Sequence, residues 1–188
     1  MNEAGAAGSI AEPSDVVAFW SAAGPDKWFA KSDAFDAEIR ENFLAIYDAA
    51  AAGRLATWEA TPDGALALLI VLDQFARNMF RGSPRTFAAD PLARTVADRA
   101  IARGFDQAVA PLERQFFYLP FEHSEAIADQ ERGVALFRAT GDAEMLKWAE
   151  LHADIIRRFG RFPHRNAVLG RATTPQEQAF LDADGFKG

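Results

Sequence analysis

The chain has 188 residues, of which 49% are hydrophobic and 25% charged, and it contains no cysteine. This length fits one domain, and the lack of cysteine excludes disulfides, zinc–thiolate centres and thiol nucleophiles. A net charge of −7 argues against nucleic-acid binding, and no apolar stretch approaches the ~20 residues of a membrane span. The first fifteen residues carry no Lys or Arg, unlike a secretory signal. We therefore expect a cytoplasmic protein with no nucleic-acid or membrane partner.

The composition predicts an all-α fold, because Ala fills 39 positions whereas Val, Ile and Thr together fill 22. Three pairs, Thr61-Pro62, Asp90-Pro91 and Thr174-Pro175, have the form of an N-cap followed by proline at the first helical position. The predicted helices are 14–22, 33–51, 62–81, 91–103, 111–119, 121–139, 142–159 and 175–182. Helix 62–81 is apolar on every side from Ala65 to Leu72, which predicts a central helix.

Residues 1–12 are rich in Ala and Gly and show no periodicity, which predicts a disordered tail before a single helical domain of residues 13–188. Short connections favour antiparallel neighbouring helices. The pattern from Ile155 to Gly170 resembles a junction between tetratricopeptide-type hairpins, although no 34-residue period recurs upstream. We expect seven to eight antiparallel helices stacked as tetratricopeptide-like hairpins without a strict repeat.

The end of predicted helix 62–81 carries polar side chains within an arc of about 140°. They are Asp73, Gln74, Arg77, Asn78 and Arg81. Because the same arc is apolar earlier in the helix, this end is expected to open onto a pocket. The alternative is the exposed tip of a buried helix, with Asp73 and Arg77 as an i,i+4 ion pair.

An aromatic run leads into a second polar segment. If the helix continues after Pro120, one of its faces carries three carboxylates, those of Glu122, Glu125 and Asp129. Neighbouring carboxylates raise one another's pKa values unless a cation neutralises them. That arrangement would suit a metal site or general acid–base chemistry, and the alternative is a solvated acidic face near a helix N-terminus. Glu122 and His123 directly follow the aromatic run and are expected near the core.

Two further features concern histidine and arginine. His152 lies in the middle of an apolar helix face, where it is either a hydrogen-bonded core histidine or a functional group. From Ile155 to Gln176 the chain has five arginines and His164 but no acid, so this segment carries +5 against −12 for the rest. These arginines either pair with Glu122, Glu125 and Asp73 or bind an anionic ligand.

No metal or cofactor is expected. All three histidines fall in these segments, but no H-E-x-x-H, His-x-His or Glu-x-x-His spacing is present. There is also no G-x-S-x-G elbow around Ser124 and no glycine-rich phosphate loop.

Three strings, residues 73–78, 119–125 and 159–166, together resemble a bacterial family described only as a domain of unknown function. They read DQFARN, LPFEHSE and FGRFPHRN, and the resemblance extends from about Asp15 to Leu181. It implies an all-helical fold of the tetratricopeptide-like superfamily in a bacterial cytoplasmic protein. It implies no activity and therefore no catalytic residue.

Three hypotheses follow from the residues. The leading one is a protein that binds a small anionic ligand or a peptide end. Its expected binding residues are Asp73, Arg77, Asn78, Arg81, Glu125, Arg161, His164, Arg165 and Asn166. The second is an enzyme with hydrolase-like chemistry, in which Glu122 or His123 is the general acid–base and His152 a second proton carrier. The third is a tetratricopeptide-like scaffold that binds a partner protein.

Overall fold

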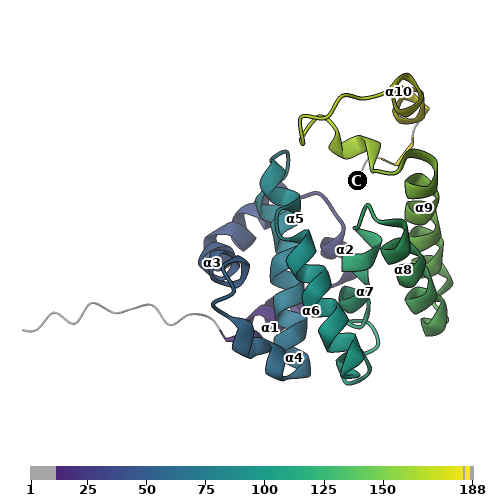
Figure 1. Ribbon diagram of the computed structural model, residues 1–188. Coiled ribbons are helices and arrows are strands. Elements are labelled where there is room, and N and C mark those ends of the chain that lie inside the picture. The colour runs from purple at the N-terminus through teal and green to yellow at the C-terminus, as the bar shows by residue number, and fades with distance from the viewer. Residues whose placement is uncertain (1–11, 184, 187–188) are drawn as a thin grey trace, which may run out of the picture.

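The computed structural model describes residues 12–183 and 185–186, and these residues form helices and connecting turns without any β-strand (Figure 1). The all-α prediction is confirmed. The helices are α1 (Pro13–Ala23), α2 (Pro25–Trp28), α3 (Asp33–Ala51), α4 (Pro62–Leu69), α5 (Ala76–Met79), α6 (Asp90–Ala102), α7 (Gln115–Glu122), α8 (Ile127–Thr140), α9 (Ala143–Phe159) and α10 (Pro175–Asp182). Short 3₁₀ turns include Pro84–Phe87 and Pro163–Arg165.

The centre of the molecule is one long helix made of α4, a π-helical segment at Ile70–Phe75, and α5. Every residue from Gly64 to Ala76 is buried, as the all-apolar stretch predicts. Helices α1, α3, α6 and α7 all pack against parts of this central helix. It begins where the sequence indicates, because the Thr61 hydroxyl caps it by accepting a hydrogen bond from the backbone N–H of Gly64.

Successive helices lie side by side across the molecule. Helix α6 packs on α4 and α7, α7 packs on α8, and α8 packs on α9. In Figure 1 the α8–α9 hairpin forms one side, and the segment from the end of α9 to α10 crosses above the ends of the other helices. A small apolar cluster of Ile155, Ile156 and Phe162 anchors that segment, apart from the main core. Membership of the tetratricopeptide-like superfamily stays a prediction.

The predicted tail lies outside the described residues except for Glu12, whose backbone N–H donates a hydrogen bond to Asp15 at the start of α1. In the described part of the chain no helix combines the length and the apolar character that a membrane crossing requires.

The predicted helix boundary at Pro120 is wrong. Helix α7 continues through this proline to Glu122, and α8 begins only at Ile127. The turn between them is fixed by Gln130, whose side-chain amide donates to the carbonyl oxygens of Glu122 and Ser124, each at 2.6 Å. These bonds satisfy carbonyl groups at the end of α7, which would otherwise lack partners. The helical face proposed for Glu122, Glu125 and Asp129 therefore does not exist.

A tight approach at Gly64 provides a test of the fold. A Cβ atom at this position would collide with the carbonyl oxygen of Trp58 and lie 2.9 Å from the Thr61 hydroxyl oxygen. We expect Gly64→Ala to lower the free energy of unfolding by about 1–3 kcal/mol and the melting temperature by roughly 2–12 °C. Gly133→Ala in α8 is the control, because its Cβ would make only ordinary contacts of 3.4–3.5 Å and should stabilise the helix by up to about 1 kcal/mol. Equal melting temperatures for the two variants would contradict this packing.

Candidate functional site

The polar side chains at the end of the central helix face two different neighbours. Asp73 and Arg77 face α6 and α7, whereas Asn78 and Arg81 both bind Asp36 on α3. The π-helical segment explains the divergence, because its i→i+5 hydrogen bonds break the regular 100° spacing from which a single arc was predicted. The structure thus separates Asn78 and Arg81, as partners of α3, from the other predicted site residues.

Arg77 links the central helix to α6. Its guanidinium binds Asp90 through two hydrogen bonds of 3.1 and 3.2 Å, and its NH1 lies 3.0 Å from Asp73 Oδ1. Asp90 was interpreted as an N-cap, but Ala89 occupies that position and the Asp90 carboxylate turns to Arg77 instead. Nothing in the sequence points to this ion pair, because the Asp90-Pro91 pair also fits a helix start.

His123 completes this group from the end of α7. Its Nδ1 lies 2.8 Å from Asp73 Oδ1, so the carboxylate fixes the tautomer with the proton on Nδ1 and a lone pair on Nε2. Burial raises the pKa of Asp73, but Arg77 and His123 outweigh it and lower that pKa to about 2. Burial, followed by repulsion from Arg77, lowers the pKa of His123. Near neutral pH the pair therefore consists of a carboxylate and a neutral imidazole.

Arg165 enters the same network from the segment after α9. Its side chain is 7% exposed and is stacked between Phe87 and Phe162, with each ring centroid 4.4 Å from the guanidinium carbon. The carboxylate of Asp90 lies 3.7 Å away, which is too long for a hydrogen bond. In the described part of the chain the guanidinium donates no hydrogen bond, and its buried Nε has no partner. Burial and repulsion from Arg77 lower the pKa of Arg165 to about 10.

His164 adds a second unsatisfied group beside Arg165. Its buried Nδ1 has no hydrogen-bond partner among the described residues, and its ring packs near Phe162 and Phe186. Burial, followed by the charge of Arg165, lowers the pKa of His164 to about 3, so the imidazole is neutral near pH 7. Its ring nitrogens can therefore donate one hydrogen bond and accept another.

Glu122 and His152 form a second carboxylate–histidine pair on the other side of α7. His152 Nδ1 lies 3.0 Å from Glu122 Oε1 and 2.8 Å from the carbonyl oxygen of Trp148, to which it donates its hydrogen bond. Both side chains are less than 9% exposed. The neighbouring residues Glu122 and His123 thus face opposite directions, Glu122 towards α9 and His123 towards the central helix.

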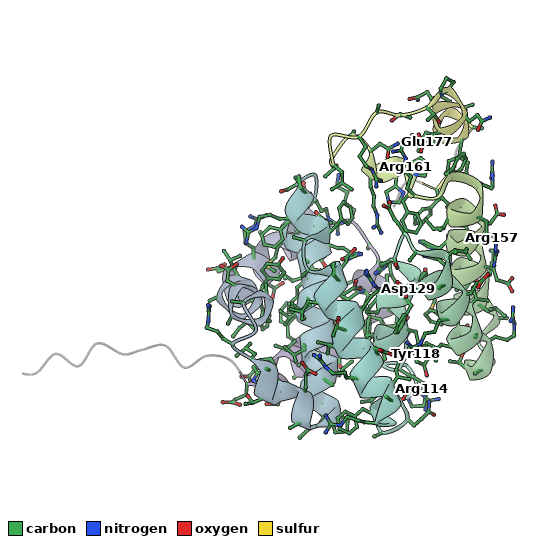
Figure 2. The ribbon with its side chains drawn as sticks, in the orientation of Figure 1. Arg114, Tyr118, Asp129, Arg157, Arg161 and Glu177 are labelled. Carbon is green, nitrogen blue, oxygen red and sulfur yellow. The ribbon has the colours of Figure 1, made fainter. Side chains whose placement is uncertain are left out.

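The remaining predicted site residues are engaged in internal contacts. Arg161 binds Glu177 of α10 through two hydrogen bonds, and Figure 2 shows the two side chains facing each other. Asn166 donates to Glu177 and accepts from Arg171. Glu125 accepts two hydrogen bonds from Arg171 at 2.7 and 3.0 Å. Of the three carboxylates named as internal partners, Glu125 pairs with an arginine of this segment, whereas the partner of Arg161 is Glu177, which was not predicted. These contacts hold the segment that carries His164 and Arg165.

The structure therefore gathers a polar cluster around Asp90, which we call the Arg165 cluster: Asp73, Arg77, Asp90, His123, His164 and Arg165. The Glu122–His152 pair lies apart from it, on the other side of α7. Two clefts lie elsewhere, one of about 340 Å³ beside Leu112 and Met145 and one of about 170 Å³ beside Leu55 and Leu92. Within the described residues, no three His, Asp or Glu side chains are grouped as metal ligands would be.

Comparison with known proteins extends the fold assignment. A family model described as a bacterial protein of unknown function (DUF924) matches residues 16–185. A solved structure of a protein of unknown function from Agrobacterium tumefaciens is 50% identical to this chain, with a TM-score of 0.89, and the match covers 91% of this chain and 97% of that one. No curated protein matches the sequence.

The internal pairing of Glu177 generates a prediction about acid stability. Hydrogen bonds from Arg161, followed by those from Thr174, lower the pKa of Glu177 to about 2. A depressed pKa means that the stabilisation is complete above pH ~4.5 and disappears as the pH falls towards 2. We expect Glu177→Gln to lower the melting temperature at pH 7 by roughly 4–8 °C, for a loss of about 2 kcal/mol.

The same variant should also lose less stability than the wild type when melting temperatures are followed from pH 5 down to pH 2. Glu131→Gln, which changes an exposed carboxylate, serves as the control and should keep the wild-type pH slope. An unchanged slope in Glu177→Gln would show that this carboxylate contributes nothing to folding.

Proposed function

The chain belongs to the bacterial family of unknown function whose model it matches, and on that premise we propose that it binds a small molecule or peptide end through an anionic group at Arg165. One observation carries the proposal: the buried guanidinium of Arg165 donates no hydrogen bond within the described residues. A guanidinium has five N–H donors, and leaving a buried polar group without a partner costs about 1–3 kcal/mol, with a larger cost for a charged one.

The neighbouring carboxylate does not remove this cost. Asp90 supplies opposite charge at 3.7 Å, but both of its oxygens already accept hydrogen bonds from Arg77. A ligand carboxylate or phosphate would provide the missing acceptors, since two of its oxygens match the fork of the guanidinium.

The surroundings of Arg165 restrict how such a group could approach. The rings of Phe87 and Phe162 each lie 4.4 Å from the guanidinium carbon, so an acceptor must reach the N–H groups that these rings leave open. His164 lies next to it with an unpartnered Nδ1, which is a second possible contact for the same ligand. Transferring an anion from water to this buried site is costly unless hydrogen bonds compensate it, so the site favours an anionic group that accepts several hydrogen bonds at once.

Thermal unfolding in the presence of inorganic phosphate, pyrophosphate, acetate and succinate tests this function. An anion at 100 times its dissociation constant adds about 2.7 kcal/mol, which corresponds to a rise of roughly 5–10 °C for this chain length. Arg165→Gln should abolish the rise, whereas Arg157→Gln should keep it, because Arg157 is exposed and points outward from α9 in Figure 2. An undiminished rise in Arg165→Gln, or no rise for any anion in the wild type, would refute the proposal.

A second candidate function, acid–base catalysis, is favoured by the 2.8 Å contact between Asp73 and His123. The carboxylate orients the imidazole so that Nε2 can accept a proton, as in enzymes that activate water or a substrate hydroxyl. Through Asp90, the ion pairs of Arg77 and Arg165 connect this histidine to the proposed anion site. In this case a bound anionic group would hold the substrate while His123 removes a proton.

A hydrolysis panel of phosphate and carboxylate esters tests the catalytic candidate. We expect His123→Gln to reduce any turnover by about 10²–10⁴-fold, while Arg157→Gln leaves it unchanged. Because His123 must be neutral to accept a proton and its pKa is lowered, the rate should rise with pH to a midpoint below 6.5 and then level off. Turnover that survives in His123→Gln would exclude this role.

A further inference from the structure

Glu122 is a second buried ionisable residue with few polar partners. The residue is 5% exposed, and the nearby Nδ1 of His152 gives its hydrogen bond to the carbonyl oxygen of Trp148. Among the described residues no group donates a hydrogen bond to Glu122 Oε2, and no lysine or arginine pairs with this carboxylate. A carboxylate that remains ionised under such burial needs a cation or several donors.

Phe162 lies close both to Arg165 and to His152, the partner of Glu122. The ring of Phe162 lies 4.4 Å from the guanidinium carbon of Arg165 and 5.6 Å from the ring of His152. His152 in turn is the residue that contacts the Glu122 carboxylate. Phe162 and His152 thus connect the surroundings of Glu122 on α7 with those of Arg165 in the segment after α9.

We propose that the ligand held by Arg165 is a zwitterion, an amino acid or a peptide end whose ammonium group binds Glu122 while its carboxylate binds Arg165. This inference rests on the proposed function and specifies the ligand class. A purely anionic ligand would satisfy Arg165 and leave Glu122 beside the imidazole of His152 but without a cationic partner among the described residues. A purely cationic ligand would do the reverse, whereas a zwitterion satisfies both groups and leaves the net charge of the region unchanged.

The aromatic residues around His152, the partner of Glu122, are consistent with a cationic group. The ring of Phe186 lies 4.5 Å from that of His152 and 6.5 Å from that of Trp148. The ring of Phe162 also lies beside His152, at 5.6 Å. An ammonium group near such rings gains from cation–π attraction, while the apolar part of the ligand packs against them. Phe186 comes from the end of the chain and is held through Gly185, whose backbone N–H donates to the carbonyl oxygen of Phe180 at 3.0 Å.

Three matched series of compounds test the inference on the full chain by calorimetric titration. Glycine, β-alanine, 4-aminobutyrate and 5-aminovalerate carry both charges at increasing separation. Acetate, propionate, butyrate and valerate lack the ammonium group, and methylamine to butylamine lack the carboxylate. We expect at least one amino acid to bind about tenfold or more tightly than its deaminated and decarboxylated partners, because charge-assisted hydrogen bonds are formed at both ends.

Variants then assign the two ends of the ligand. Glu122→Gln should weaken the preferred amino acid to the level of its deaminated partner, whereas Glu131→Gln should keep the preference, because Glu131 is exposed. Arg165→Gln should abolish binding of both compounds. Circular dichroism and the melting temperature of each variant check that it is folded, and the selectivity of the wild type decides the question even if Glu122→Gln does not fold.

The outcomes separate the two proposals. If the simple carboxylates bind as tightly as their amino derivatives, the zwitterion inference fails while the anion site at Arg165 stands. If neither series binds and inorganic phosphate does, the ligand class is wrong but the proposed function survives. If no anion of any kind binds, both proposals fail together.

Discussion

The paired hydrogen bonds between Arg77 and Asp90 are the interaction on which the rest of the candidate site depends. They join the central helix to the first turn of α6, and Asp90 in turn faces Arg165. Arg77 also stabilises the charged form of Asp73, which orients His123. A single guanidinium thus holds two carboxylates in place, and each carboxylate positions a different candidate group. Because all these side chains are buried or nearly so, water screens the interactions only weakly.

Local signals in the sequence predict the helices well, because each depends on neighbouring residues. Thr61 and Thr174 cap helices as expected, and the apolar stretch after Thr61 becomes the buried central helix. The π-helical segment was not predictable in this way, since nothing in its side chains distinguishes it from a regular helix. The end of α7 was missed for a related reason. It is set by Gln130, a residue of the following helix whose amide reaches back to the carbonyl oxygens of α7.

The same distinction between local signals and distant contacts holds for the candidate site. The sequence indicated the unusual residues, and the structure brings His123, Arg165 and Asp73 into one network. Which arginines pair internally could not be predicted, because the partners of Arg161 and Arg171 are a glutamate 16 residues later and one 46 residues earlier. The residues that surround Arg165 were also missed. Phe87 and Asp90 lie more than 70 positions before it, and only the three-dimensional packing brings them together.

The stacking of Arg165 between Phe87 and Phe162 joins distant parts of the chain in one contact. Local opening of either the turn at Pro84–Phe87 or the segment after α9 would therefore dismantle the same guanidinium environment. A compound that binds only the assembled form would suppress both openings at once. Amide hydrogen exchange would then slow in both segments together, although they share no secondary structure. Occupancy of the site could therefore be detected in amides that are far from Arg165 in the sequence.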